Sequence, residues 1–381
     1  MSLIKFKNFS IANYFSKTKR NQLIDNLIIK KSKYSSLLFL EKNFNPLNLS
    51  ENNKIIEYSE PEDHINKVAR LLIKNSNFKN LKVLGISSKD TTLINEIKKI
   101  KNKTFTKIFS KNTSLENAID KFYKINSEQK FNIIIMRHIW EHIPEQKLFL
   151  KKIKKILDEK HIIYIEVPDC KKLIRNFDYS MIWEEHMYYY NQTNLKYELT
   201  KLGLKKIKFL RVSHPQEDNL CFLLKVSDIK KYKNLLDKKS DYYSKMFIKK
   251  FNINKKNTKN FFLRLKKSGF NFYFFGASHM LNTFLNIYDL KNYTDFVIDD
   301  NKKKINKFFA GLENKIISLK DVKKNEIKKT IFFISCNISA EKKIIKRLKL
   351  LDKSVLFFSI FPLSKNYFFK KKLIYENKKN K

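Results

Sequence analysis

Cysteine, glycine and proline are all scarce in this chain of 381 residues. Its three cysteines (Cys170, Cys221 and Cys336) lie far apart and form no CxxC pair, which excludes a disulfide framework and a cysteine zinc knuckle. The five glycines and six prolines are too few for a collagen-like or low-complexity chain. No apolar run reaches the roughly 18 residues typical of a membrane span, and we recognise no signal peptide. We therefore expect no membrane span and a cytoplasmic, reducing location.

Acidic residues are also few, because 37 Asp and Glu stand against 80 Lys and Arg, a formal net charge of +43. Such a charge is typical of nucleic-acid-binding proteins. The excess, however, is mostly lysine spread along the chain together with Asn, Ile and Phe, a composition that A/T-rich codons alone would produce. Arginine, which makes bidentate contacts to phosphate and guanine, is scarce. We expect no specific nucleic-acid partner, but increased affinity for acidic ligands such as nucleotide phosphates.

Apolar residues make up 43% of the chain, enough to bury a core in each of two or three domains. From Tyr58 onwards, short buried strands alternate with amphipathic helices, which indicates an α/β domain with a mostly parallel sheet. The expected helices are 62–74, 92–100, 147–157 and 194–202, and the expected strands are 82–86, 105–109, 131–136, 161–167, 207–212 and 221–226. The last two strands are candidates for antiparallel pairing.

A second α/β unit begins after a charged helical region at residues 227–266. Its expected strands are 270–275, 294–298, 330–335 and 354–360, and its expected helices are 280–288 and 341–351. We therefore predict an α/β fold with two Rossmann-like domains in tandem. The predicted units are a basic, loosely ordered lead-in (1–55), the first domain (56–226), and a helical segment with the second domain (227–381).

Two segments combine histidine, carboxylate and tryptophan. The first contains His142 and follows a buried strand, and residues just past the carboxyl end of a strand line the ligand crevice of an open α/β sheet. The second contains Trp183, Glu185 and His186. A histidine beside a carboxylate suits proton transfer, because imidazole titrates near neutral pH and the carboxylate can orient it. We expect His142 and His186 to converge on one cleft at the rim of the first sheet.

His138 and His142 also fit the H-x-x-E-H pattern of zinc peptidases. That motif needs a continuous helix to bring both histidines to one face. Here a strand runs into His138, and Pro144 disfavours a helical conformation at the residue before it. We therefore predict no metal site.

Polar loops at strand ends are candidates for approaching a nucleoside cofactor. Gly85, Ser87 and Asp90 lie between a strand and a helix of the first unit, where a Rossmann-like domain meets its cofactor. In the second unit, Gly276 directly follows a strand, and Asp299 follows the next strand, where an acid can face a ribose. An ordinary βα turn and a helix cap explain the same residues, so both interpretations stay open.

Together these segments resemble the sugar C-methyltransferases, which are class I S-adenosylmethionine-dependent enzymes with a second Rossmann-like domain. The matching text is RHIWEHIPEQKLFLKKIKKIL, IYIEVPD, FDYSMIWEEHMYYYNQTNLKYELTKLGL, FYFFGASHMLNTFLNIYDL and FVIDDNKKKINKFFAGLENKI. The resemblance implies S-adenosylmethionine as the cofactor and a nucleotide-linked 3-keto-6-deoxy sugar as the acceptor, for surface polysaccharide or secondary metabolism. It also implies that a base removes the proton next to the ketone and that the resulting enolate attacks the methyl group.

The resemblance implies roles for individual residues as well. By position, His186 is the general base, Glu185 is its neighbour in the site, and His142 helps to hold the enolate oxygen or the sugar. Trp183 stands where the family usually has tyrosine. The other site residues expected are Gly85, Ser87, Asp90, Arg137 and His138 for the cofactor, and Trp183, Tyr58, Gly276, Asn282 and Asp299 for the substrate.

Three features depart from the family pattern. No cysteine precedes Cys170, so the usual N-terminal zinc-binding cysteines are missing. The cofactor loop from Gly85 to Thr91 lacks two glycines and the acid after the first strand, and no acid follows the next strand. A non-catalytic member that binds a nucleotide or sugar is therefore the alternative function, and a basic nucleic-acid-binding protein is the third.

Overall fold

The computed structural model describes residues 3–12, 15–19, 24–41, 62–76, 78–110, 115–125, 128–227 and 237–370. In this part of the chain, a six-stranded sheet has the strand order β10-β11-β8-β7-β5-β6. Its strands are β5 (Leu81–Ser87), β6 (Thr104–Ser110), β7 (Phe131–Arg137), β8 (Leu157–Asp169), β10 (Leu204–Val212) and β11 (Asp218–Val226). β5 to β8 run parallel, whereas β11 pairs antiparallel with both β8 and β10, as the sequence allowed for the last two strands.

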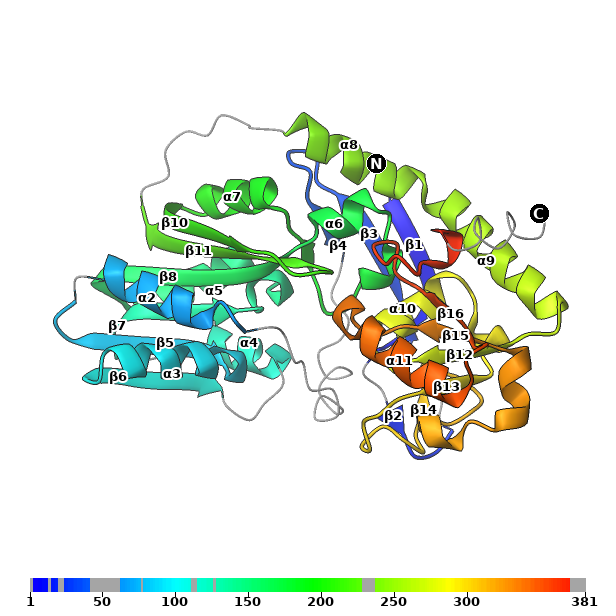
Figure 1. Cartoon of the computed structure of the whole chain (residues 1–381). Helices are drawn as coiled ribbons and strands as arrows, with labels where there is room; N and C mark the ends of the chain where they lie inside the picture. Colours follow the sequence, from blue (N-terminus) through cyan, green and yellow to red (C-terminus); the bar gives the residue numbers. More distant parts are fainter. Residues whose placement is uncertain are drawn as a thin grey trace.

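Helices cover both faces of this sheet (Figure 1). They are α2 (Ile65–Asn75), α3 (Thr91–Ile100), α4 (Leu115–Tyr123), α5 (Gln146–Lys155) and α7 (Gln192–Lys201). On one face, Leu72 of α2 packs in a cluster with Ile133 and Ile135 of β7, and on the other, Phe149 of α5 packs with Ile134. β7 is therefore buried on both faces, which explains its uninterrupted apolar sequence.

A short helix, α6 (Lys171–Arg175), follows β8 in the first domain. The second domain begins with α8 (Lys238–Lys249) and α9 (Phe251–Lys267). Its parallel sheet has the order β13-β12-β15-β16. The remaining elements are β12 (Asn271–Phe275), α10 (His279–Ile287), β13 (Phe296–Ile298), β15 (Thr330–Ile334), α11 (Glu341–Leu351) and β16 (Leu356–Ser359). The predicted α/β fold with Rossmann-like parallel sheets is confirmed. Among the helices described, none is long and apolar enough to cross a membrane.

The N-terminal residues differ from the loosely ordered lead-in that we predicted. β1 (Leu3–Ser10), β3 (Ile24–Lys31) and β4 (Leu38–Leu40) form an antiparallel sheet with β9 (Tyr188–Tyr189), and β2 (Phe15–Ser16) pairs with β14 (Phe308–Phe309). Ile4 and Phe6 are buried while the lysines beside them are exposed, which is the period-two pattern of a half-buried strand. The prediction failed because these strands pair with partners far away in the chain.

Candidate functional site

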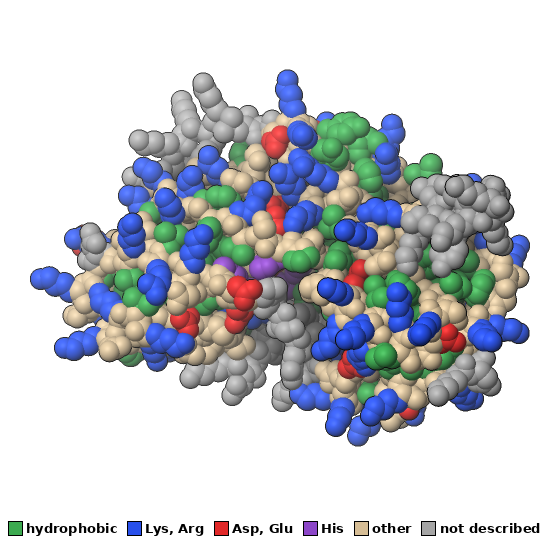
Figure 2. All heavy atoms as spheres, in the orientation of Figure 1, with side chains coloured by type: hydrophobic (Ala, Val, Ile, Leu, Met, Phe, Trp, Pro, Cys, Tyr) green, Lys and Arg blue, Asp and Glu red, His purple; other side chains and the backbone are tan. Residues whose placement is uncertain are grey.

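The carboxyl edges of the two parallel sheets face each other across a cavity of about 460 Å³. The first domain contributes Lys89, His138, Glu141, Trp183, His186, His214, Glu217 and Asn219 to its wall, and the second domain contributes Ser278, His279, Lys304, Cys336 and Asn337. Figure 2 shows histidine side chains where the two domains meet. A cavity of this size and mixed polarity is within the range of small-molecule binding sites.

His142 and His186 meet at this cavity, as the sequence analysis expected. Their ring centroids lie 4.7 Å apart with an interplanar angle of 87°. The Trp183 ring lies 4.8 Å from the His186 ring and 5.7 Å from the His142 ring. His186 and Trp183 line the cavity, whereas His142 is buried beside them and Glu185 is 8% exposed. The structure thus brings the two rings together, with His186 on the cavity wall and His142 buried against it.

Two local structures hold these side chains. After β7, His138 adopts a left-handed backbone conformation (φ +49°), and the chain then forms a single 3-10 turn over Trp140–His142. This turn is too short to be the helix of the zinc-peptidase motif. Trp183 is fixed by the Tyr189 hydroxyl, which accepts from its backbone N–H and donates to its carbonyl, each at 3.0 Å. Tyr189 belongs to β9, so the N-terminal sheet holds the His186 segment in place.

The second domain supplies a third imidazole that the sequence analysis missed. The His279 ring stacks on the Trp183 ring at 4.6 Å with an interplanar angle of 22°, although the two residues lie far apart in the chain. Burial, with the nearby charges of Lys304 and Lys89, lowers the pKa of His279 to about 4. The imidazole is therefore neutral at physiological pH. Sequence could have flagged it only through its position just after the Gly276 turn.

The acid stability of the protein is expected to depend on His279. Because its folded-state pKa of about 4 lies below the ordinary value of 6.5, only the unfolded chain binds this proton between those pH values. The contribution that the neutral His279 ring makes to the free energy of unfolding is complete above pH 6.5 and is lost as the pH falls toward 4. In urea unfolding at pH 7.0 and 4.5, we expect His279→Gln to lose about 2 kcal/mol less stability than the wild type. Equal losses in both proteins would contradict the lowered pKa.

Glu166, at the carboxyl end of β8, is the centre of a buried polar network that the sequence analysis did not single out. Its carboxylate is fully buried and accepts from His64 Nε2 (3.0 Å), Arg137 Nε (3.1 Å) and the Tyr164 hydroxyl (2.7 Å). It also accepts from Asn219 Nδ2 (3.0 Å) and lies 3.3 Å from the Nε2 atom of His138.

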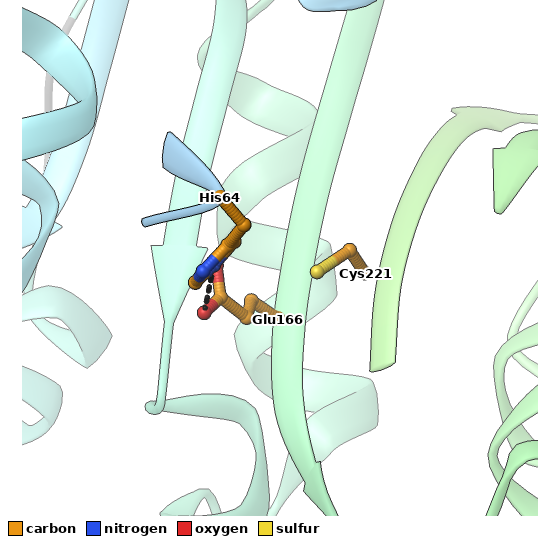
Figure 3. A group of neighbouring side chains, drawn as sticks. All are labelled: His64, Glu166 and Cys221. Atoms are coloured by element: carbon orange, nitrogen blue, oxygen red, sulfur yellow. Dashed lines mark hydrogen bonds and ion pairs between the residues drawn. The ribbon is translucent and has the colours of Figure 1, made fainter. Parts of the chain in front are cut away.

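These partners keep Glu166 ionised. Burial raises the pKa of Glu166, but hydrogen bonds from His138 and His64 and the charge of Arg137 outweigh it and hold the pKa well below its usual range. Figure 3 shows the Glu166 carboxylate turned toward His64, with Cys221 on the neighbouring strand. Because His138 and Asn219 both line the cavity, the network fixes part of the cavity wall.

The loop after β5 differs from the cofactor loop that we expected. The Asp90 carboxylate accepts from the backbone N–H groups of Ile86 (2.7 Å), Ser87 (3.0 Å) and Arg137 (2.9 Å), and it is fully buried. A Cβ atom at Gly85 would lie 2.8 Å from the Asp90 Cβ atom, so the glycine makes room for this carboxylate. Asp90 and the two backbone donors therefore hold the loop in shape instead of facing a ligand.

The Arg137 side chain also donates its hydrogen bonds to other residues of the protein. Besides Glu166, it donates to Glu62 Oε1 (2.9 Å), the Lys89 carbonyl (2.7 Å) and Thr92 Oγ1 (2.9 Å). The Ser87 hydroxyl accepts from the backbone N–H of Lys89 and caps the following turn. Of the five expected cofactor residues, His138 is the one that lines the cavity.

In the second domain, the residues that were expected to bind substrate contact other parts of the protein. Gly276 has φ +113°, and a Cβ atom there would lie 2.9 Å from the Cβ atom of Cys336. Asn282 is fully buried and donates to the Ser10 carbonyl (2.7 Å), so it anchors β1 on α10. Asp299 accepts from the Ala277 N–H (2.9 Å) and pairs with Lys304. Tyr58 lies outside the described residues.

A metal ion has a candidate donor set at the site. Among the residues that the structure describes, Glu141, His142 and His186 bring their ligand atoms within 4.8 Å of one another, and so do His64, Glu166 and Cys221. Carboxylate and imidazole donors suit divalent transition metals, so the first set could hold such an ion. In the second set, Arg137 already neutralises Glu166, which disfavours a cation there.

Comparisons with known protein families agree with this geometry. Residues 49–208 match the family model described as a methyltransferase domain, and residues 225–354 match the C-methyltransferase C-terminal domain. The chain is an S-adenosylmethionine-dependent methyltransferase. The first matched segment ends within β10, and the second begins within β11 and ends just before β16.

Solved methyltransferases are similar to part of this chain. An S-adenosylmethionine-dependent methyltransferase from Clostridium acetobutylicum is 12% identical, covering 45% of this chain and 94% of its own, with a TM-score of 0.33. The 1,6-didemethyltoxoflavin-N1-methyltransferase of Burkholderia thailandensis is 11% identical, covering 44% of this chain and 80% of its own, with a TM-score of 0.32. Likenesses this weak carry no argument about the substrate. No curated protein matches the chain.

S-adenosylmethionine is the cofactor of this methyltransferase, and the cavity offers groups that fit it. The amino-acid end of the cofactor carries an α-carboxylate and an α-ammonium group. Lys89 and Glu141, of opposite charge, both line the cavity beside His138 at the carboxyl edge of the first sheet. These side chains could hold the amino-acid end, whereas the backbone donors bound to Asp90 could not.

Proposed function

We propose that this methyltransferase acts on a carbon atom of a nucleotide-linked 3-keto-6-deoxy sugar through an enolate. The observation that carries the proposal is the 4.7 Å approach of the His142 and His186 rings at a cavity between the two domains. Carbon methylation next to a ketone needs a base for the α-proton and a donor for the oxygen that becomes negative. The His186 imidazole on the cavity wall and the His142 imidazole buried against it supply both.

His186 acts as the base in this mechanism. One ring nitrogen takes the proton from the carbon next to the ketone, and the electron pair of the broken C–H bond moves to the ketone oxygen. His142, buried beside it, donates a hydrogen bond that helps to hold the enolate oxygen or the sugar. Glu185, the chain neighbour of His186, is largely buried and orients the imidazolium that forms.

The methyl transfer itself is mainly a matter of positioning. S-adenosylmethionine supplies an electrophilic methyl group when bound. The enolate carbon would take this methyl group as the electron pair on the oxygen returns and restores the ketone, and His186 would pass its proton to water. Lys89, His138 and Glu141 would hold the amino-acid end of the cofactor at the first sheet.

The charge of the cavity supports a nucleotide-linked substrate. Lys304 from the second domain lines it, and its ammonium group suits a phosphate of the substrate, whereas Lys89 is assigned to the cofactor. The Trp183 ring lies beside the base in the cavity wall. The volume of about 460 Å³ suits a ligand the size of a sugar with part of its nucleotide.

Two assays on the full-length chain test this function. TDP-, UDP- and GDP-linked 3-keto-6-deoxy sugars are incubated in D₂O without cofactor, and deuterium gain at the α-carbon is followed by mass spectrometry. Methyl transfer is then measured with labelled S-adenosylmethionine. We expect both reactions with at least one of the three nucleotides, because the base works without the methyl donor. The same nucleotide sugars without the ketone are the matched control and are expected to be inert.

The proposal fails if the protein catalyses neither exchange nor methylation with any of the three keto sugars. Calorimetry with S-adenosylmethionine adds a separate measurement of cofactor binding. Binding without activity on the keto sugars would point to another acceptor for this methyltransferase.

A further inference from the structure

We propose that His279 is a second catalytic residue: a neutral imidazole from the second domain whose N–H donates a hydrogen bond to the ketone oxygen of the substrate and to the enolate oxygen formed from it. This inference rests on the proposed function and extends it. The comparisons place residues 225–354, which include His279, in the C-methyltransferase C-terminal domain. The second domain would thus contribute to the chemistry as well as to binding.

The position of His279 is the first argument. It lines the cavity, and its ring stacks on the Trp183 ring at 4.6 Å. The His186 ring contacts the same Trp183 ring at 4.8 Å. A substrate with its α-carbon at His186 therefore lies near the Trp183 ring, one face of which is covered by His279. The base and the donor come from different domains and meet on one aromatic platform.

The rigidity of His279 is the second argument. It is the first residue of α10, and the Ser278 hydroxyl caps that helix by accepting from the Leu281 N–H (3.2 Å). Asn282, one turn later, is buried and bonded to β1, and the Thr283 hydroxyl donates to the Ile182 carbonyl (2.6 Å) next to Trp183. The helix and the Trp183 segment are thus joined directly. A donor fixed before the reaction stabilises a developing charge without reorganisation.

The charges around His279 are the third argument. Lys304 and Lys89 are the cations near it, the positive end of the α10 dipole lies at its backbone, and His186 and Glu217 face the same cavity. Asp299, the nearby acid on the second domain, is already bonded to Lys304 and the Ala277 N–H. Positive surroundings disfavour a second proton on the ring, so one ring nitrogen carries the single N–H that a neutral imidazole donates.

The chemistry needs no proton from His279. When His186 takes the α-proton, the negative charge appears on the former ketone oxygen, and the hydrogen bond from His279 shortens against it. When the new carbon–carbon bond forms, the electron pair returns from the oxygen and the ketone is restored. His279 ends in the protonation state in which it began. Removing one such donor typically slows a reaction by about 10²–10³-fold.

Three variants test the inference in the deuterium-exchange assay with the keto sugar that the wild type accepts. We expect His279→Ala to reduce the maximal exchange rate by about 10²-fold, because the donor is lost. His279→Gln keeps an N–H and is expected to stay within about tenfold of the wild type. His161→Gln is the control, because that ring lies at the opposite end of β8 beside the Val226 N–H. It is expected to match the wild type.

The tryptophan emission gives a readout that needs no substrate. A protonated imidazole quenches a stacked indole, so the wild type is expected to show an acid transition below pH 5 that His279→Gln lacks. A transition near pH 6.5 that the wild type shows and His279→Gln lacks would mean a charged His279 ring in the working range and would overturn the neutral-donor role.

The failure of this inference is distinct from the failure of the proposed function. A wild type inert toward all keto sugars rejects the proposed function. An active wild type with an equally active, folded His279→Ala variant rejects His279 alone, and circular dichroism at 25 °C verifies the fold. Equal losses in His279→Ala and His279→Gln would also overturn it, because the glutamine keeps the donor.

Discussion

Replacing His186 by alanine is expected to abolish methyl transfer and deuterium exchange while leaving S-adenosylmethionine binding nearly unchanged. A positioned general base contributes about 10²–10⁴-fold to a proton transfer, and this contribution is lost with the His186 ring. The cofactor-binding groups that we propose, Lys89 and Glu141, do not depend on the His186 ring. Initial rates with the accepted keto sugar and calorimetry with the cofactor measure the two effects separately.

Added imidazole distinguishes a base from a structural role at this position. In His186→Ala, the space left beside Trp183 can admit a free imidazole, which is expected to restore part of the exchange rate in a concentration-dependent way. The His161→Gln variant is again the control, with wild-type rates and no response to imidazole. Near-normal turnover of His186→Ala would reject His186 as the base.

Replacing Arg137 by methionine is expected to reduce the free energy of unfolding by about 3–5 kcal/mol, because it leaves Glu166 buried with its main cation removed. The Arg137 side chain is 2% exposed, and its guanidinium pairs with Glu166 and Glu62. Although burial lowers the pKa of Arg137, the charge of Glu166 and the bond to Glu62 raise it above its ordinary value. Urea unfolding at pH 7 measures the loss.

Two further variants show whether the loss comes from the buried charge. Arg70→Met changes an exposed arginine that bonds to Asn66 on α2, and its effect is expected to stay within about 0.5 kcal/mol. Adding Glu166→Gln to Arg137→Met is expected to recover part of the loss, because the unpaired carboxylate is removed. A loss below about 1 kcal/mol in Arg137→Met would contradict a charge network that depends on the guanidinium.

Most elements of both domains could be predicted from local patterns. The helix expected at 341–351 has those bounds in α11, and the buried run at 131–136 became β7 with one more residue. β8 begins at Leu157, four residues before the predicted strand, because Leu157 pairs with Phe131 of β7. Pairing partners lie elsewhere in the chain, so local patterns do not define such strand ends.

The sequence by itself determined the tandem α/β architecture and the two histidine segments, because apolar periodicity and residues at strand ends are local properties. The tertiary structure alone decided what those residues touch. In the fold, the Asp90 carboxylate accepts hydrogen bonds within the cofactor loop, and Asn282 donates to β1. Glu166 lies at the centre of a buried polar network, and His279 stacks on Trp183. Each of these contacts joins positions far apart in the chain, and burial and charge pairing between distant segments leave no period or spacing in the sequence.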